Sequence, residues 1–377
     1  MPVMDSSSPS FSAEAWIASA LLGQPLAAEL LPVCEWEQVV HAADAHGVGP
    51  LLLQNLSQCE NWKTYPAEFR ESLSKPTYQQ VAWDMGWQND LGKILDQFDR
   101  AGIRYLLIKG AGVAFTHYEH SYLRVRCDTD ILFPDMAVFE QAWALLKSMG
   151  FLRQNTLSGE FVGYQHCCYR PLGQGFQQVL DCHIRINDYQ FFADAFSFDE
   201  LYAHAVPLPQ LAESARTLGP VHALLMACMH RVGTIPFGNA DRLIWLFDMY
   251  LLARSFSDDQ WQEFLALARQ RQLCGSCVHS LEAARGFFPI VVPGDLMTEM
   301  QQFAKKEPFK PGQEMKRWRY YFHVFKSVPG LRNKAKLVQE HFLPSGDYLM
   351  QKYQTSNRFA LPFLYVRRVF GGLRRYF

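Results

Sequence analysis

A run of branched and aromatic residues, Ile103–Ile108, has the pattern of a short buried strand. Gly102 stands before it and Lys109–Gly110–Ala111–Gly112 follows it. Glycine steps of this kind are typical of the ends of strands. The pattern therefore predicts one strand over residues 103–108.

Two further stretches predict strands that carry acidic side chains. In Cys127–Phe133, Asp128 and Asp130 leave the same face, because side chains alternate along a strand. Gln178–Ile186 alternates in the same way and predicts a half-buried strand with an apolar face of Leu, Cys and Ile residues. Its opposite face carries Val179, Asp181, His183 and Arg185.

This third strand is also predicted to form a β-hairpin. Phe161–Tyr169 and Gln178–Ile186 flank the segment Pro171–Phe176, whose two glycines suit a hairpin loop. The pairing is expected to place three side chains on one face of the strand next to Asp181, and these are Tyr164, His166 and Cys168.

Helical patterns surround the predicted strands. Ser12 is a suitable N-cap for the first helix, and Gly102 stands where the C-terminal cap of the fourth belongs. Before the strands, helices are predicted at Ala13–Leu22, Glu35–His46, Pro50–Leu56 and Tyr78–Ala101. After them, helices are predicted at Met136–Met149, Val221–Arg231, Asp241–Arg254, Asp258–Gln272 and Gly275–Phe288.

The order of these elements predicts an α+β fold, with a small mixed sheet between an N-terminal and a C-terminal helical region. At 377 residues the chain is long enough for two or three domains. We expect a helical region over 1–100, a core that carries the sheet over 101–205, a helical domain over 206–300 and a basic region over 301–377.

Charge is distributed unevenly along the chain. The net charge is -1, but from Lys305 onward 16 Lys and Arg stand against 4 Asp and Glu. The last residues interleave aromatics with arginines, which suits a membrane surface or nucleic-acid phosphates. We expect instead that this tail docks on the acidic remainder of the chain.

The nine cysteines are odd in number and scattered, which is typical of reduced thiols in the cytoplasm. No secretory segment or membrane-length apolar run is apparent, and the Ser/Pro-rich residues Met1–Ser10 are expected to be disordered. Cys274, Cys277 and His279 have the spacing of part of a zinc site, but a second ligand pair is missing, so we do not expect one.

The candidate chemistry rests on Asp128, Asp130 and Asp181. Like charges brought close together need a positive partner, and an all-oxygen set of ligands suits a hard cation such as Mg²⁺. In a two-metal site such cations clamp the attacking and leaving oxygens of a phosphoryl transfer. The alternative is that the three aspartates are solvated strand ends or turn residues.

The ordered motifs resemble a known family. A Gly-containing step after a strand, Asp-x-Asp on the next strand and one later Asp are similar to nucleotidyltransferases of the DNA polymerase β type. More narrowly, Leu-Ile-Lys109-Gly110, then Arg124 before Asp128-Thr-Asp130, then Asp181-Cys-His183, resemble a bacterial nucleotidyltransferase-like family. The resemblance covers about residues 78–255 and includes the segment that begins at Asp241.

The resemblance implies roles for these residues. Asp128, Asp130 and Asp181 would hold Mg²⁺ or Mn²⁺, with Asp181 as general base. Lys109, Gly110 and Arg124 would bind the triphosphate, and the alternative for the two cations is a surface lysine and a structural ion pair. The superfamily commonly has Gly-Ser in place of Lys109-Gly110.

The polar face of the third strand offers further candidates. His183 and Arg185 share the face of Asp181, and His183 would either order that aspartate, contact the acceptor or make a hydrogen bond within the sheet. Arg126 is explained equally well by a salt bridge at the sheet edge. On the helix at 241–254, the residues that lie off the apolar stripe could close over a base or take part in surface ion pairs; they are Asp241, Arg242, Trp245 and Asp248. His230 is expected to be structural.

The sequence therefore predicts an enzyme that moves a nucleoside monophosphate from a nucleoside triphosphate to an unidentified acceptor hydroxyl. One alternative is a non-catalytic relative that binds a nucleotide or another ligand, which the missing Gly-Ser supports. Another is a toxin-like enzyme that nucleotidylates tRNA or protein, for which the basic tail is suggestive.

Overall fold

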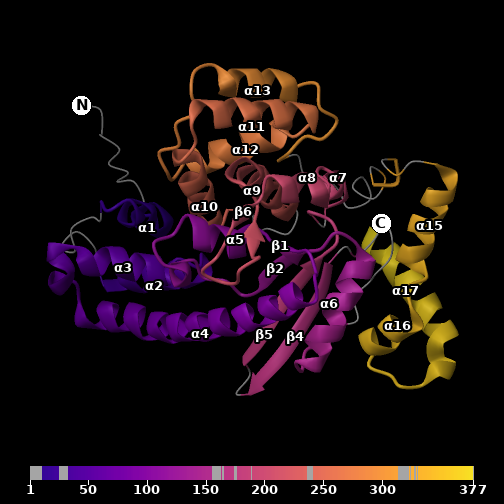
Figure 1. The fold of residues 1–377 in the computed structure, drawn as a ribbon. Coiled ribbons are helices and arrows are strands. Elements are labelled where there is room, and N and C mark those ends of the chain that lie inside the picture. Colours follow the sequence, from indigo (N-terminus) through magenta and orange to yellow (C-terminus); the bar gives the residue numbers. More distant parts are fainter. Residues whose placement is uncertain are drawn as a thin grey trace, which may run out of the picture.

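A seven-stranded mixed sheet lies at the centre of the computed structural model, with helices on both sides of it in the sequence (Figure 1). The structure describes residues 11–24, 33–154, 163, 165–173, 176–187, 189–235, 241–312, 322, 324–326, 328 and 330–376. The predicted disorder of Met1–Ser10 lies outside these residues. The predicted α+β fold with helical flanks is confirmed.

The strands are ordered β3-β4-β5-β2-β1-β7-β6 across the sheet. The pairs β2–β5 and β1–β7 are parallel and the other pairs are antiparallel. The strands are β1 (Leu106–Leu107), β2 (Thr129–Leu132), β3 (Leu152–Arg153), β4 (Gln165–Gly173), β5 (Phe176–His183), β6 (Val206–Pro207) and β7 (Arg216–Thr217).

Strand β1 is shorter than the sequence predicted, and strand β5 ends earlier than predicted. Lys109 has a φ of 53°, in the left-handed region, and starts α5 (Lys109–Thr116) directly after β1. The chain therefore leaves the sheet at once, and the Gly-rich step after the strand is the first turn of a helix. β5 ends at His183, so the prediction that the strand runs on to Ile186 is wrong.

The N-terminal helices lie where the apolar pattern placed them, with one exception. Ser12 caps α1, accepting a hydrogen bond from the backbone N–H of Ala15 at 3.2 Å. The helices are α1 (Ala13–Leu21), α2 (Val33–Ala45), α3 (Gly49–Gln58), the 3₁₀ helix η2 (Glu60–Thr64) and α4 (Ala67–Arg100).

Helix α4 begins eleven residues before the predicted start at Tyr78, and it contains Pro76. A proline inside a helix removes one backbone hydrogen bond, which is why the sequence favoured a later start. Leu73 and Phe69 are buried about one and two turns before Pro76, so packing keeps this part of the chain helical. The helix ends as predicted, with Gly102 at a φ of 66°.

The remaining helices agree with the predictions to within three residues where both exist. Around the sheet they are η3 (Ser121–Leu123), α6 (Met136–Ser148), α7 (Gln190–Ala193) and α8 (Phe198–Ala203). The following helices are α9 (Pro220–Thr234), α10 (Leu243–Arg254), α11 (Asp258–Gln270), α12 (Cys274–Arg285) and α13 (Leu296–Ala304). The tail contains α15 (Leu331–Phe342), α16 (Gly346–Lys352), η5 (Arg358–Ala360) and α17 (Leu361–Tyr376).

Buried apolar side chains form three clusters. The largest joins α1–α3 to α9–α13, and the second lies between the sheet, α4 and α6. Residues from the predicted 1–100 and 206–300 regions thus share one core, while the boundaries of the four regions remain a prediction. A small third cluster, Val324, Val328 and Leu337, belongs to the tail.

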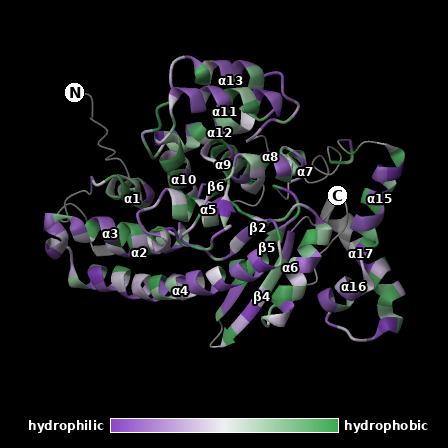
Figure 2. Ribbon diagram, viewed as in Figure 1, coloured by the Kyte–Doolittle hydropathy of each residue, from purple (hydrophilic) through white to green (hydrophobic). Residues whose placement is uncertain are grey.

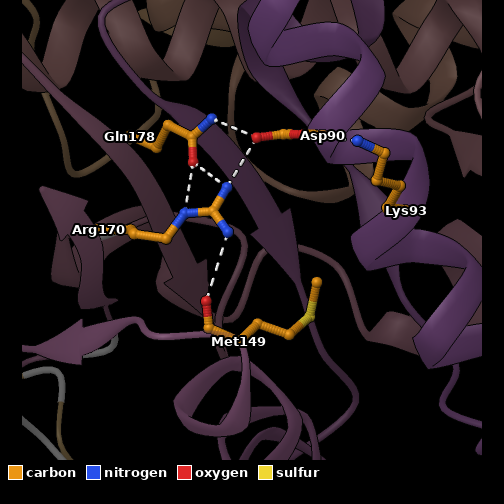
Figure 3. A network of polar contacts seen from close by, with 5 residues as sticks. All are labelled: Asp90, Lys93, Met149, Arg170 and Gln178. Carbon is orange, nitrogen blue, oxygen red and sulfur yellow. Dashed lines mark hydrogen bonds and ion pairs between the residues drawn. The ribbon is translucent and has the colours of Figure 1, made fainter. Parts of the chain in front are cut away.

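A polar network fastens the hairpin of β4 and β5 to α4 (Figure 3). Arg170 Nη2 lies 2.8 Å from Asp90 Oδ2, and Gln178 Nε2 donates to the same oxygen at 3.0 Å. Arg170 also donates from Nε to Gln178 Oε1 at 2.8 Å and from Nη1 to the carbonyl of Met149 at 3.3 Å. The hairpin that carries Asp181 is therefore fixed against the long helix.

Candidate functional site

The structure brings the three predicted aspartates to one end of the central strands. Asp130 on β2 and Asp181 on β5 are register partners in a parallel pair, so both side chains leave the same face of the sheet. Asp128 lies one residue before β2. The i, i+2 argument for Asp128 and Asp130 needed only the local chain, whereas the Asp130–Asp181 pairing depends on how the sheet is assembled.

Lys109 provides a positive charge next to Asp130. Its Nζ lies 2.7 Å from Asp130 Oδ1 and 3.3 Å from His183 Nε2. His183 Nε2 is in turn 2.9 Å from the same Asp130 oxygen, and the His183 side chain is fully buried. Burial raises the pKa of Asp130, but Lys109 and His183 outweigh it and hold this pKa below its usual value. Asp130 is therefore ionised and its Oδ1 is shared by two partners.

Asp128 is in the opposite electrostatic situation. Burial and the neighbouring carboxylates of Asp130 and Asp181 raise its pKa to about 7, although Lys109 and His183 act in the other direction. The positive charge that is present is therefore directed at Asp130, and the Asp128 end of the cluster has an excess of negative charge. A cation bound there would relieve this repulsion.

Oxygen ligands of this kind suit a hard cation such as Mg²⁺. Within the described parts of the chain, however, no three His, Cys, Asp or Glu side chains are already placed as a metal cage. Lys109 contacts Asp130, and Asp181 Oδ2 accepts a hydrogen bond from Gln165 Nε2. The donor set thus has the right chemistry, and binding a metal would require these side chains to rearrange.

The hairpin has a different register from the one expected around Asp181. Cys167 is the partner of Asp181 across the strands, while His166 pairs with Cys182 and so faces the other side of the sheet. The expectation that His166 and Cys168 lie on the face of Asp181 is wrong, and Tyr164 lies outside the described residues. Gln165 and Cys167 are the site neighbours that the sequence did not indicate, because a one-residue change of register exchanges the faces.

Arg124 reaches across to α10. Its guanidinium forms a buried ion pair with Asp248, from Nε at 3.1 and 3.2 Å and from Nη2 at 2.7 Å. Nη1 donates to the carbonyl of Val125 at 2.7 Å. Since an arginine has five N–H donors, one N–H on each of Nη1 and Nη2 remains for another partner. Asp248 therefore does not make the surface ion pair that was the alternative for the helix; its ion pair is buried.

Gly110 is the close neighbour of this arginine. A Cβ at position 110 would lie 2.7 Å from Arg124 Cζ and 2.8 Å from both terminal nitrogens. The absence of a side chain at Gly110 thus lets the guanidinium pack against the first turn of α5. Its predicted role in admitting a triphosphate remains a prediction.

A cavity of about 180 Å³ lies beside these groups. Its floor is formed by the first turn of α5 and the start of β2, and its other side by α9 and α10. Residues from both sides line it, including Lys109, Gly110, Arg124, Asp128, Asp130, His230, Arg242, Trp245 and Asp248. The cavity therefore brings the predicted phosphate-binding residues and two of the three carboxylates, Asp128 and Asp130, together with α10, whereas Asp181 is not part of its lining.

A family model described as uncharacterised nucleotidyltransferase matches residues 32–289. The chain belongs to this family. No curated protein matches the chain. The match includes every residue that lines the cavity and the two strands β2 and β5, and it ends before α13. Membership in the nucleotidyltransferase family supports transferase activity in general.

Two other arginines predicted near the three aspartates have partners of their own. Arg126 is buried and its Nη2 lies 2.7 Å from Asp84 of α4, with the guanidinium 5.2 Å from the ring centre of Phe115. Arg185 lies beyond the end of β5, is exposed and pairs with Asp194 at 3.0 Å. The prediction that Arg185 shares the strand face of Asp181 is therefore not met, because the strand stops at His183.

Beside the cavity, the side chains of Arg242 and His230 pack against Trp245 of α10. Arg242 stacks its guanidinium 5.3 Å from the ring centre of Trp245, and the His230 ring lies 4.7 Å from the same side chain. Burial lowers the pKa of His230 to about 3, so this histidine is neutral. Asp241 forms an ion pair with Arg231 of α9.

At the start of α12, the backbone N–H groups of Cys274 and Gly275 have a carboxylate partner. The backbone N–H groups of Cys274 and Gly275 both donate to the buried carboxylate of Glu307 at 2.7 Å. A carboxylate at this position satisfies the free N–H groups at the start of α12. His279 directs Nδ1 to Arg231 Nη1 at 2.8 Å.

Proposed function

We propose that this family member transfers a nucleoside monophosphate from a nucleoside triphosphate to an acceptor hydroxyl, with Mg²⁺ or Mn²⁺ held by Asp128, Asp130 and Asp181. The observation that carries the proposal is the register of β2 and β5, which pairs Asp130 with Asp181 while Asp128 stands one residue before the strand. Three carboxylates at one strand end, beside a cavity, are what a phosphoryl-transfer site requires.

The cationic side chains of the cavity bind the triphosphate in this proposal. Lys109 extends from the turn between β1 and α5, and the first N–H groups of a helix are free to meet phosphate oxygens. Arg124 has two N–H groups left after binding Asp248 and Val125. Bound metal would neutralise the phosphate charge and activate the acceptor hydroxyl.

Asp181 takes the proton of the acceptor hydroxyl in this scheme. Its Oδ2 accepts a hydrogen bond from Gln165 Nε2, so Gln165 orients this carboxylate. His183 positions Asp130 through its Nε2 and, being fully buried, does not contact the acceptor. The nucleophile is thus activated on β5, while the triphosphate is held at the turn before α5. The acceptor oxygen bonds to the α-phosphorus, the bond to the β-phosphate breaks, and pyrophosphate leaves.

One observation favours a second function, ligand binding without catalysis. Lys109 stands 2.7 Å from Asp130 Oδ1, where a cation would otherwise bind, and the Gly-Ser step common in the DNA polymerase β type superfamily is absent. In this alternative Lys109 replaces the metal permanently, and the cavity binds a ligand that is not turned over.

A thermal-shift panel with ATP, GTP, CTP and UTP, with and without Mg²⁺ or Mn²⁺, separates the two functions. Binding at about 100 times Kd adds roughly 2.7 kcal/mol to the free energy of unfolding. We expect one triphosphate to stabilise the native chain only with metal. The Asp128→Asn/Asp130→Asn variant should show no shift, and the exposed pair Asp199→Asn/Asp259→Asn should behave like the native chain.

The second step identifies the reaction. With the stabilising triphosphate labelled on its α-phosphate, label should move into an acceptor from a cell extract, and separation by size shows whether the acceptor is a small molecule, tRNA or protein. Metal-independent stabilisation without any transfer would establish the binding function instead. No stabilisation by any triphosphate would contradict both uses of the cavity for nucleotides.

A further inference from the structure

Large apolar side chains are exposed mainly in the C-terminal segment. Phe359 is 95% exposed and Leu331 86%, whereas among the described residues of this segment the buried apolar side chains are few and include Val324, Val328, Leu337, Leu349 and Leu364. The exposed members of the segment are Phe322, Phe325, Leu331, Val338, Leu343, Phe359, Phe363 and Val366. Gathered apolar exposure of this kind marks an interaction surface.

Helix α17 has an inner face that is already occupied. Leu364 is buried, Tyr365 donates its hydroxyl to the carbonyl of Pro344 at 2.7 Å, and Arg368 Nη2 donates to the carbonyl of His341 at 2.8 Å. These contacts fasten α17 to α15 and to the start of α16. Phe363, Val366 and Arg367 of the same helix are exposed.

The outer face of α17 is apolar and aligned. Phe359, Phe363 and Val366 follow one another at spacings of four and three residues, so they lie in one stripe that runs from η5 along the helix. Arg367 is exposed beside this stripe. An apolar stripe flanked by cationic side chains is the pattern of a helix that lies in the plane of a membrane surface.

Helix α15 repeats the arrangement. Leu337 packs inward, while Leu331 and Val338, seven residues apart, are exposed on one side. Arg332 and Lys336 are exposed on the same helix, and Lys334 lies 5.3 Å from the ring centre of Phe325. Figure 2 shows apolar and polar positions interleaved along both helices.

The positive charge of the C-terminal segment indicates which kind of partner would bind its exposed apolar side chains. From Lys305 onward 16 basic residues stand against 4 acidic ones. None of the helices among the described residues has the length and apolar character to span a bilayer, so the segment would bind on a surface. Single-stranded RNA needs aromatic platforms for its bases, whereas half of the exposed apolar residues here are Leu or Val, which suit acyl chains.

We propose that α15 and α17 form a membrane-binding surface that attaches the protein to anionic bilayers through the stripe Phe359, Phe363 and Val366. The apolar side chains enter the boundary of headgroups and acyl chains, and the lysines and arginines contact anionic headgroups. The earlier expectation that the tail docks on the acidic body leaves this stripe without a partner in the structure, and the bilayer supplies one. The surface is separate from the cavity and does not depend on the proposed transfer reaction.

Co-sedimentation of the full chain with vesicles tests this. We expect binding to phosphatidylcholine vesicles containing about one third phosphatidylserine, at least tenfold weaker binding to phosphatidylcholine alone, and a similar loss at 0.5 M salt. The variant Phe359→Ser/Phe363→Ser/Val366→Ser should bind at least about a hundredfold more weakly, because each apolar side chain contributes to insertion.

A matched control keeps the result specific. Met85→Ser/Leu152→Ser/Val291→Ser removes three exposed apolar side chains from the body and should leave vesicle binding unchanged. Circular dichroism and thermal unfolding of both triple variants confirm that each is folded. Equal binding by the stripe variant and the native chain, or stripe-dependent binding to single-stranded RNA in the absence of vesicle binding, would overturn the proposal.

Discussion

Arg124 and Asp248 form a buried ion pair that joins the segment before β2 to α10, 124 residues further along the chain. The pair fixes one wall of the cavity against the carboxylates on its floor. Both side chains are less than a tenth exposed. At such a depth, removing one partner leaves an uncompensated charge, while removing both need not be costly.

This asymmetry gives a double-variant prediction. Asp248→Ala should lower the free energy of unfolding by about 3 to 5 kcal/mol, and Arg124→Met/Asp248→Leu should recover most of that loss. Urea unfolding measures both. We also expect the double variant to lose the metal-dependent stabilisation by a triphosphate, because the two remaining N–H groups of Arg124 are gone. A double variant that is stable and still binds nucleotide would assign Arg124 a purely structural role.

Gly110 should tolerate no side chain while Arg124 is held in place. The Cβ of Gly110→Ala would lie 2.7 Å from Arg124 Cζ, and Asp248 prevents the guanidinium from moving aside. We expect a loss of about 1 to 3 kcal/mol in urea unfolding. Gly86→Ala, in the interior of α4 with open space around its Cβ, should instead gain about 0.5 to 1 kcal/mol. Stabilisation by both substitutions would mean that Arg124 is not fixed.

Local patterns in the sequence predicted the parts of the site that depend on local geometry. Asp128 and Asp130 were expected on one face because the strand period is two, and Ser12 and Gly102 marked helix ends through their own hydrogen bonding and backbone freedom. The alternation in Gln178–Ile186 put Asp181 on the polar face of a predicted strand, but no short-range pattern connects it to β2.

The sequence could not supply the contacts that tertiary packing decides. The register of β4 against β5 puts Cys167 beside Asp181, and a shift of one residue would have exchanged it for His166. Pro76 lies inside α4 because buried neighbours outweigh its helix-breaking tendency. The pairing of Arg124 with Asp248 joins residues whose separation exceeds any local period.

Lys109 should be needed for the stability of the site as well as for binding triphosphate. Its Nζ is 2.7 Å from Asp130 Oδ1, and the Asp130 side chain is 9% exposed. Lys109→Met therefore leaves a buried carboxylate with His183 as its remaining close partner, and we expect a loss of about 2 to 4 kcal/mol at neutral pH by urea unfolding. Lys93→Met, which removes an exposed ion pair to Asp90, should cost less than about 1 kcal/mol. Similar losses for the two variants would show that Lys109 does not neutralise Asp130 in solution.

Buried histidines should make the fold sensitive to mild acid. His222, at the start of α9, packs against Phe196, and burial together with the nearby charge of His204 lowers its pKa from 6.5 to about 4, with Glu200 acting in the other direction and Arg271 in the same one. The unfolded chain takes up a proton as the pH falls below 6.5, but the folded chain does so only near pH 4, so stability is lost across this window. His222→Gln, which stays neutral, should remove roughly 2 kcal/mol of that loss between pH 7 and pH 4.5 in urea unfolding. Parallel profiles for His222→Gln and the native chain would show that the folded chain binds a proton at His222 as readily as the unfolded chain does.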